Sequence, residues 1–406
     1  MVKIPHFAVA AWFDENAHDA KHDLAGTASA TLSIKDLIEI SEHSEKTKEA
    51  LDFNLINLNY NSPMRGGHQL RDNLAALYSA RAGGVTRDDI LTCNAGIDAN
   101  HIVLAALIEP TDHVICHWPT YQQLYEVPRS LGAEVSLWRT DASKKWQLDI
   151  EELKGLIKEN TKMIIVNVPQ NPSGAIIPKP QLEDIIELAE EKGIIVFCDE
   201  AFRPLFHNIL PSDDNFPNSI VNMGYKKTIA SGTMSKAYGL PGIRAGWIVS
   251  RDPQIIAQCF KMRYYTTTTV SQLNEAVAAE ALSDRCIHAL LARNIQYCKT
   301  NAEAWQNFID EHNWACSWVK PVAGTTAMVK FHKMGKPVDD VQLCLALQKK
   351  AGVCLIPGSR CFGDGEYLKG YVRTGIGLDP KQVKEGLAAL AKFMEDDFAD
   401  VPVAAK

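Results

Sequence analysis

Several classes of protein are excluded by what the sequence lacks. Its ten cysteines stand as single residues, for example Cys93, Cys116 and Cys198, and none forms a C-x-x-C pair, so neither a zinc site nor a thioredoxin-like motif is supported. No apolar run approaches the roughly 18 residues that would span a membrane. The N-terminal segment contains no basic region followed by a long apolar core. We therefore expect a cytoplasmic protein with buried free thiols, no metal and no membrane contact.

Basic residues are fewer than acidic ones, 42 Lys and Arg against 49 Asp and Glu. The formal net charge is −7 at pH 7, so no overall basic field favours nucleic acid as a partner. Internal repeats and low-complexity segments are absent as well. The chain has 406 residues, 46% of them hydrophobic and 22% charged, which suits a large globular domain with a smaller companion. We expect its partner to be a small molecule rather than nucleic acid.

Short apolar runs alternate with helical patterns through the middle of the chain. Seven such runs cover residues 90–93, 113–117, 133–137, 163–168, 194–198, 228–232 and 245–250. Helical patterns separate most of them, at residues 98–107, 121–131, 150–158 and 179–191. Strands that alternate with helices are typical of a mostly parallel sheet covered on both faces. The sequence therefore predicts an α/β fold with a mostly parallel, seven-stranded sheet between helices.

The predicted sheet lies in a large domain, residues 50–285, between two other segments. Residues 1–49 form an N-terminal arm that contributes to a small domain. Within it, Ser33 followed by Asp36 predicts the start of a helix that extends to about Ala50. Residues 286–406 form the small C-terminal domain. Its predicted α+β elements are a long helix at about 284–312, strands at 325–331 and 371–374, and helices at 338–350 and 380–394.

The first predicted strands are followed by residues that suit a bound ligand, because ligands of such sheets bind beyond the carboxyl ends of the strands. Gly96 and Ile97 lie in a small-residue turn that opens a helix and offers backbone N–H groups to a phosphate. Tyr121 follows the second strand and can stack on a flat ring. Taken alone, an ordinary strand–helix turn and a core tyrosine are the alternatives.

Two polar residues follow later strands. Asn171 lies in the rigid turn Pro-Gln-Asn-Pro-Ser-Gly and can donate its amide to a ligand oxygen. Asp199 closes an apolar strand, where a buried carboxylate needs a partner such as a pyridinium nitrogen or a metal. A structural loop and a helix cap are the alternative roles of these two residues.

The strongest group of candidates follows the sixth predicted strand. Thr233 and Ser235 supply hydroxyls and Arg244 supplies a guanidinium, which together suit a phosphate. Lys236 stands beside them, where desolvation would lower its pKa and let it attack an aldehyde. Late in the chain, Arg373 lies inside an apolar strand and needs an anion, either a substrate carboxylate or a structural Asp or Glu.

In this order and spacing, these segments resemble the class I/II aminotransferases, which are fold-type I pyridoxal-phosphate enzymes. The resemblance covers about residues 23–392, and its most specific motif is Thr-x-Ser-Lys with an arginine eight residues after the lysine. It implies that the cofactor is pyridoxal 5′-phosphate and that Lys236 holds it as a Schiff base and then carries a proton. Asp199 would pair with the pyridine nitrogen and strengthen the electron sink, and Asn171 would bond the 3-oxygen of the ring.

The resemblance also implies roles for the remaining positions. Tyr121 would stack on the cofactor ring, and the phosphate would be held by four residues, Gly96, Ile97, Thr233 and Arg244. Arg373, together with Asn171, would bind the α-carboxylate of the substrate. Tyr60 would reach the phosphate of the neighbouring subunit, which implies a homodimer with shared active sites.

Phe202 departs from the family pattern, in which a tyrosine hydroxyl bonds the 3-oxygen of the ring. Without that hydroxyl we expect a higher pKa for the Schiff base of the lysine. The same phenylalanine occurs in capreomycidine-synthase-like cyclases, to which residues 235–242 and 360–363 are also similar. Two reactions of an α-amino acid therefore stay open: transamination, or elimination, replacement or ring closure by a lyase or cyclase. A sensor protein is a remote third interpretation, because we expect no room for a DNA-binding domain outside 23–392.

The side chain of the substrate is not fixed by these motifs. Five residues lie near the predicted site loops and are candidates for contacting a polar side chain: Arg65, His68, His117, Trp118 and Arg203. Each is equally well explained as a structural or surface residue. Their positions relative to the predicted lysine decide between the two roles.

Overall fold

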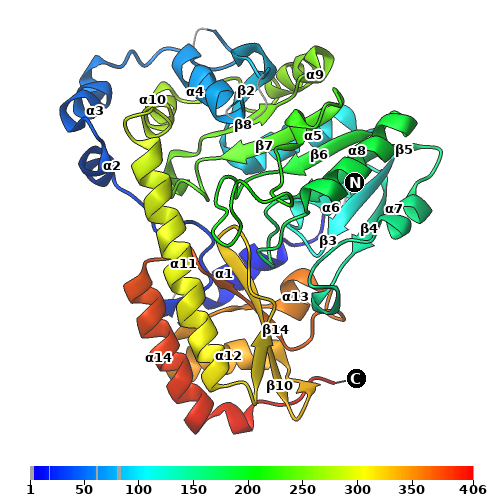
Figure 1. The fold of residues 1–406 in the computed structure, drawn as a ribbon, viewed down its shortest axis with the longest axis vertical. Helices are drawn as coiled ribbons and strands as arrows, with labels where there is room; N and C mark the ends of the chain where they lie inside the picture. The colour runs from blue at the N-terminus through cyan, green and yellow to red at the C-terminus, as the bar shows by residue number, and fades with distance from the viewer. Residues whose placement is uncertain (1–3, 18, 61–62, 80–83, 406) are drawn as a thin grey trace.

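The computed structural model describes residues 4–17, 19–60, 63–79 and 84–405, and its largest feature is a seven-stranded sheet (Figure 1). The strands are β2 (Ile90–Cys93), β3 (His113–Trp118), β4 (Glu134–Arg139), β5 (Thr161–Asn167), β6 (Ile195–Asp199), β7 (Thr228–Thr233) and β8 (Gly246–Val249). Their order across the sheet is β2-β8-β7-β6-β5-β3-β4. β8 is antiparallel to both of its neighbours, and every other pair is parallel. The prediction of a mostly parallel, seven-stranded sheet is confirmed.

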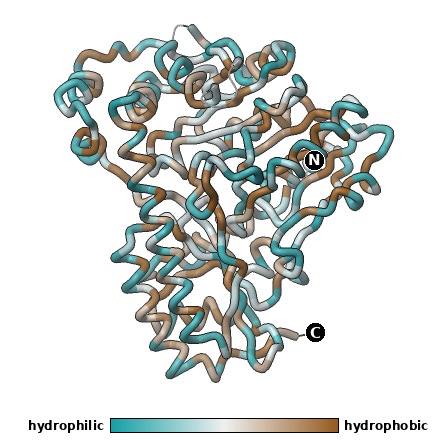
Figure 2. Tube along the Cα trace, in the orientation of Figure 1, coloured by the Kyte–Doolittle hydropathy of each residue, from teal (hydrophilic) through white to brown (hydrophobic). Residues whose placement is uncertain are grey.

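Alternate residues of the central strands feed two hydrophobic cores, because successive side chains of a strand point to opposite faces. In β5, Ile164 and Val166 belong to one core, while Met163 and Ile165 belong to the other. The first face is covered by α4 (His68–Ser79), α7 (Ile150–Leu156), α8 (Lys179–Lys192) and α10 (Gln272–Ala281). The second face is covered by α5 (Ala95–Leu107), α6 (Gln123–Ser130) and α9 (Pro253–Arg263). The strands between these helices are largely hydrophobic (Figure 2).

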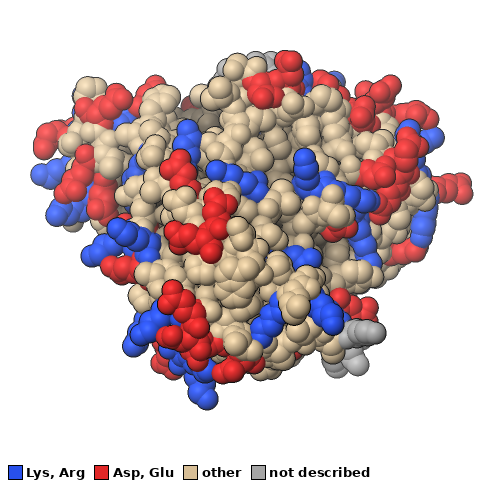
Figure 3. Space-filling model, turned by 60° about the horizontal axis from the view of Figure 1, so that its bottom comes forward, with Lys and Arg blue, Asp and Glu red and all other residues tan. Residues whose placement is uncertain are grey.

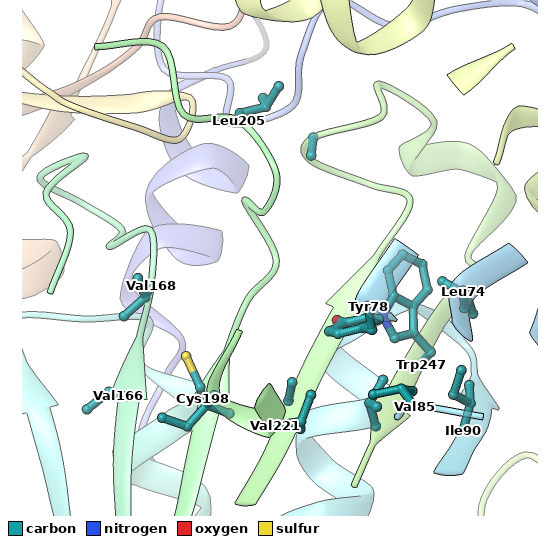
Figure 4. Close-up of a cluster of buried hydrophobic side chains, with 14 of the residues drawn as sticks. Leu74, Tyr78, Val85, Ile90, Val166, Val168, Cys198, Leu205, Val221 and Trp247 are labelled. Carbon is teal, nitrogen blue, oxygen red and sulfur yellow. The ribbon is translucent and has the colours of Figure 1, made fainter. Parts of the chain in front are cut away.

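The covering helices follow from their amphipathic sequences. In α8, the residues Leu182, Ile185 and Ala189 recur at helical spacing and are buried against the sheet. The helix ends at Gly193, whose φ of +70° suits glycine. Figure 4 shows the same core farther along the sheet, where the indole N–H of Trp247 on β8 donates a 3.0 Å hydrogen bond to the hydroxyl of Tyr78 on α4. Helix packing thus fixes the sheet that carries the site residues.

A smaller antiparallel sheet lies beyond the large one (Figure 1). Its five strands are β9 (Cys316–Trp318), β10 (Thr326–Lys333), β11 (Lys336–Pro337), β13 (Ile356–Pro357) and β14 (Tyr371–Gly375). The helices of this part are α11 (Ile287–Glu311), α12 (Asp340–Ala351), α13 (Gly358–Phe362) and α14 (Pro380–Asp396). α11 extends from the large sheet down the side of the small one (Figure 1). The expected smaller α+β unit is therefore present, while the boundaries at residues 49 and 285 stay a prediction.

The N-terminal segment contains a helix, α1 (Ala8–Asn16), which the sequence analysis did not predict. The indole of Trp12 is 1% exposed, and its Nε1 donates a 3.0 Å hydrogen bond to the carbonyl of Leu355. A short strand that follows, β1 (His22–Asp23), pairs in parallel with β12 (Val353–Cys354). These contacts attach the N-terminal segment to the smaller part, and α1 lies between the two sheets (Figure 1).

The predicted helix after Ser33 is shorter than expected. Ser33 and Asp36 form the predicted capping box, but the helix they start, α2 (Ile34–Ile40), ends before Ser41. The hydroxyl of Ser41 accepts a hydrogen bond from the backbone N–H of His43, a local bond that competes with helix continuation. A separate helix, α3 (Ser44–Ala50), follows. The prediction of one continuous helix was wrong for this reason.

The part of the chain that the structure describes contains no helix long and apolar enough to cross a membrane. Within the same residues, no group of three or more His, Cys, Asp or Glu side chains is arranged to hold a metal ion. All ten cysteines are buried thiols, as predicted. On the face shown in Figure 3, acidic and basic side chains are interspersed.

Candidate active site

The polar residues that follow the strands come together at the carboxyl edge of the large sheet. β6 ends in Asp199, β7 ends in Thr233, and β2 leads into the first turn of α5. A cavity of about 330 Å³ opens at this edge and is lined by residues of all three elements. Arg373, on β14 of the smaller sheet, also lines the cavity. The cavity therefore lies between the two sheets.

Lys236 lies just after β7 and lines this cavity, where it is half-buried. Its Nζ donates a 2.5 Å hydrogen bond to the hydroxyl of Thr27. Burial lowers the pKa of the amine from 10.5 to about 8; the positive charges of Arg373 and Arg244 add to this effect, and the carboxylate of Asp199 opposes it. A large share of the amine is therefore neutral near pH 8 and can act as a nucleophile or a base.

Asp199 is a buried carboxylate with a defined set of donors. Its Oδ1 accepts a 3.0 Å hydrogen bond from the backbone N–H of Ala201, and its Oδ2 accepts a 2.9 Å bond from Nδ2 of Asn100. The amide oxygen of Asn100 in turn accepts a 2.6 Å bond from the hydroxyl of Ser231. Burial raises the pKa of Asp199, while these donors and the charge of Lys236 lower it. The network holds the carboxylate in one orientation inside the cavity.

Arg373 is a buried guanidinium, 2% exposed, beside Asn171. One of its nitrogens donates a 3.0 Å bond to the carbonyl of Ala25, and the other lies 3.4 Å from Oδ1 of Asn171. Neither acceptor is an Asp or Glu side chain, so these bonds do not match the structural salt bridge that was the alternative. Among the described residues, its Nε has no hydrogen-bond partner. Burial lowers the pKa of Arg373 to about 10, because the charged guanidinium is removed from water. A bound anion would stabilise this buried charge.

A group of donors surrounds the N-terminus of α5. The N-cap residue, Asn94, makes no side-chain cap, so the first N–H groups of this 13-residue helix are available to an anion. Gly96 packs closely on Thr233, whose hydroxyl donates a 3.0 Å bond to the hydroxyl of Ser235. The guanidinium of Arg244 lies 3.5 Å from the same Ser235 oxygen. The helix end, the two hydroxyls and the guanidinium form one anion-binding corner.

Apolar and aromatic side chains complete the lining. Tyr121 faces the cavity, its ring centroid lies 5.1 Å from that of Phe7, and burial raises its pKa to about 12. Phe202 is buried in the lining and carries no hydroxyl. Ile97, next to the anion-binding corner, is partly exposed and also faces the cavity. These side chains provide flat, apolar surfaces between the charged groups.

Tyr60 lies outside the lining of this cavity. Its ring is 70% exposed, and it lies with Asn94 and Arg244 in a neighbouring hollow. Leu55 and Leu58, from the same segment, are also largely exposed. An exposed apolar strip, Leu55–Tyr60, therefore runs beside the anion-binding corner.

The five residues suggested as contacts for a substrate side chain are absent from the described lining of the cavity: Arg65, His68, His117, Trp118 and Arg203. His117 is buried against Gln170, and burial lowers its pKa to about 3. Arg203 forms an ion pair with Glu200 at 3.2 Å. The positions of these residues agree with the structural or surface roles that the sequence left open.

The sequence analysis missed several residues of the lining. Phe13 lies in the unpredicted helix α1, Phe7 immediately precedes that helix, and Thr27 follows it in the chain. Asn100 lies one helical turn after Gly96, a spacing that places both on the same side of α5. The three-residue spacing Phe7-Ala10-Phe13 is the one sequence signal that would have indicated an apolar helix face.

Residues 38–390 match the family of class I and II aminotransferases. The chain belongs to this family. The matched interval includes both sheets and the anion-binding corner, whereas α1 and Thr27 precede it. The chain is accordingly a pyridoxal-phosphate enzyme of the aminotransferase type, and the fold is that of the fold-type I enzymes.

Individual relatives carry two kinds of name. The chain is 26% identical to capreomycidine synthase of Streptomyces vinaceus over 382 residues. This alignment covers 94% of this chain and 92% of that protein. A PLP-dependent aminotransferase from Streptococcus suis has 33% identity and a TM-score of 0.87, over 97% of this chain and 98% of that one. The PLP-dependent cyclase OrfR has a TM-score of 0.82 over 97% and 98% of the two chains, with 24% identity, and supports the fold. Transamination and a lyase or cyclase reaction are both compatible with these relatives.

Proposed function

We propose that this enzyme transaminates an α-amino acid, with Lys236 as the residue that attaches the cofactor and moves the proton. One observation carries the proposal: a half-buried lysine, Lys236, lines a single cavity together with a buried carboxylate, Asp199, and a buried arginine, Arg373. When bound, pyridoxal phosphate supplies an aldehyde that condenses with amines and a ring that withdraws electrons from the α-carbon of the substrate. The other tasks fall to the side chains of the cavity.

The side chains fit this cofactor in charge and in shape. The anion-binding corner around Arg244 suits a phosphate, because it combines a helix N-terminus with hydroxyl and guanidinium donors. A buried carboxylate such as Asp199 needs a positive partner, and a protonated pyridine nitrogen is one. Tyr121 offers its ring for stacking. Asn171 accepts from Arg373 through Oδ1, so Nδ2 is the donor that it offers to a ligand oxygen.

Lys236 would take the proton from the α-carbon of the substrate. Its low pKa leaves the amine ready to accept a proton at Nζ, and the hydroxyl of Thr27 orients it. Arg373 would bind the α-carboxylate through its Nε and a neighbouring nitrogen, and thereby place that carbon near the amine. Asp199 and Arg373 are buried and Lys236 is half-buried, so these groups are only partly screened by water.

Phe202 is the observation that favours the second candidate, a lyase or cyclase. The sequence resemblance implies the same phenylalanine in capreomycidine-synthase-like enzymes, and capreomycidine synthase is among the relatives. In either reaction the same residues hold the amino acid and remove its α-proton. We therefore expect Phe202→Tyr to lower the pKa of the lysine nitrogen that holds the cofactor, as read from the pH dependence of the cofactor absorbance. An unchanged or higher pKa in the variant would contradict the role given to Phe202.

We further propose a cytoplasmic homodimer in which the exposed strip Leu55–Tyr60 contacts the other subunit. The exposed leucines of this strip and its position beside Arg244 support this arrangement. Tyr60→Phe should then weaken cofactor binding without changing the stability of the chain. Light scattering that gives the mass of one chain would refute the dimer.

Half-reactions test the proposed function directly. The cofactor-loaded enzyme is mixed with single amino acids, and the products are separated and identified by mass spectrometry. Pyridoxamine phosphate with a 2-oxo acid of unchanged side chain supports transamination. Loss of a side-chain substituent or a ring-closed product, without pyridoxamine phosphate, selects the lyase or cyclase reaction. Borohydride should fix the cofactor to Lys236 and leave Lys236→Ala unlabelled.

A further inference from the structure

Helix α1 supplies a wall of the cavity that has no role in the chemistry proposed above. Three residues of α1 line the cavity, Val9, Ala10 and Phe13, and so does Phe7, which immediately precedes the helix. All four side chains are apolar. This segment precedes residues 38–390, the interval that matches the aminotransferase family. The wall therefore comes from the N-terminal segment, outside the interval matched by the family model.

The wall is attached to both parts of the molecule. At its start, the backbone N–H of Ala8 donates a 2.7 Å bond to Oε1 of Gln122, and Nε2 of Gln122 donates a 3.0 Å bond to the carbonyl of His6. Gln122 immediately follows Tyr121, the tyrosine of the cavity. Farther along the helix, buried Trp12 bonds to the carbonyl of Leu355 in the smaller part. α1 is thus held at two points across the cavity.

The charges of the cavity are already used by the proposed function. Four charged side chains line it among the described residues: Asp199, Lys236, Arg244 and Arg373. The proposal assigns the first three to the cofactor and Arg373 to the α-carboxylate. The described lining that a single chain supplies offers no further cation to a second carboxylate, and a carboxylate buried against phenylalanine rings without a partner is strongly disfavoured.

We propose that α1 forms the subsite for the substrate side chain, so that the enzyme selects amino acids with an apolar side chain over acidic ones. The inference rests on the proposed function at one point, the binding of the α-carboxylate by Arg373. An aromatic or aliphatic side chain would then lie against Phe7 and Phe13 and remove their rings from water. Phe7 already packs on Tyr121, so the subsite begins beside the cofactor position.

Two carboxylic acids without an amino group test the subsite apart from the chemistry. 3-Phenylpropanoate and succinate both offer a carboxylate to Arg373, but only the former presents an apolar group to α1. Calorimetric titration of the cofactor-loaded enzyme should give at least roughly tenfold tighter binding of 3-phenylpropanoate. Phe13→Ala and Phe7→Ala should each weaken its binding by about tenfold. Asp14→Ala, on the exposed side of the same helix, should change neither affinity.

A gain-of-function variant distinguishes a specific effect on the subsite from simple unfolding of the alanine variants. Phe13→Arg places the missing cation in the wall, and it should reverse the preference toward succinate while the melting temperature shows that the chain stays folded. Equal or tighter binding of succinate by the unmodified enzyme would overturn the subsite. So would Phe13 and Phe7 variants that bind 3-phenylpropanoate as well as the unmodified enzyme does.

The same experiments separate the subsite from the proposed function. If no amino acid yields a product but binding of 3-phenylpropanoate depends on Phe7 and Phe13, the function fails and the subsite stands. If aspartate and glutamate react fastest and succinate binds more tightly, the function stands and the subsite fails. In that second case the cation that holds the side chain comes from outside the described lining.

Discussion

Replacing Lys236 by methionine in the cofactor-free enzyme measures the cost of burying the amine. Folding lowers the pKa of this amine from 10.5 to about 8, mainly through burial. At pH 7 the amine is charged in both the folded and the unfolded chain, and the lowered pKa corresponds to about 3 kcal/mol of lost stability. Methionine has a similar length and no charge. The variant should therefore be more stable than the unmodified enzyme at pH 7.

The size of this gain depends on pH in a defined direction. Between pH 8 and 10.5 the unfolded chain keeps a proton that the folded chain has released, so the stability of the unmodified enzyme rises with pH in this window. At pH 9.5 the penalty has fallen to about 1.5 kcal/mol. Loss of the hydrogen bond to Thr27 subtracts about 1 kcal/mol from the gain at every pH. The pH-dependent part of the gain therefore shrinks by about 1.5–2 kcal/mol between pH 7 and pH 9.5.

Equilibrium unfolding in urea at a series of pH values checks this expectation. Lys192→Met is the matched control, because that lysine lies at the exposed end of α8 and its replacement should give no such pH dependence. A stability gain of Lys236→Met that stays constant from pH 7 to pH 9.5 would refute the reasoning. It would mean that the amine is charged to the same extent in the folded and the unfolded chain.

Other residues of the cavity give further predictions. Asn100→Ala removes a hydrogen bond to a buried carboxylate, worth about 1.5–3 kcal/mol, and should raise the dissociation constant of the cofactor at least roughly tenfold. Fluorescence titration measures the change, and Asn222→Ala, whose amide binds a carbonyl away from the cavity, should leave it unaltered. Arg373→Gln should raise KM for amino acids by at least about a hundredfold while leaving cofactor affinity unchanged, and equal losses in both would contradict its assignment to the carboxylate. Gly246→Ala places a methyl group 2.4 Å from the carbonyl carbon of Ala95 and should displace the start of α5; an unchanged melting temperature together with full cofactor retention would contradict this.

The elements that the sequence predicted share a simple local signal. Each strand of the large sheet is an apolar run bounded by polar or turn residues, and such a run is buried whichever neighbours it pairs with. The placement of Asp199 and Lys236 in one cavity was predictable because a charged residue at or just beyond the end of a buried strand has few structural explanations. The sequence was informative where a buried apolar strand is closely followed by a charged residue.

The elements that escaped prediction depend on distant contacts. α1 begins at Ala8 without any side-chain cap, and its residues are apolar on more than one side because it packs between two parts of the molecule. Asn100 reads as an ordinary polar residue of a helix. Only the folded sheet brings it the carboxylate of Asp199, at the end of β6, and the hydroxyl of Ser231, within β7. The residues next to Asn100 in the sequence give no indication of either of its two hydrogen bonds.

The charges around Lys236 are arranged so that ligand binding raises its affinity for a proton. In the cofactor-free cavity, Arg244 and Arg373 both oppose a positive charge on the amine, and Asp199 favours it. Under the proposed function, a phosphate bound beside Arg244 would cancel the first repulsion, and a carboxylate bound to Arg373 would cancel the second. The pKa of the amine would thus be lowest in the empty site, and the amine would become a stronger base once the amino acid is in place. An amine without a carboxylate would leave the charge of Arg373 uncancelled, so it would bind more weakly and would also meet Lys236 as a weaker base. Discrimination against such an amine would therefore appear in kcat as well as in KM.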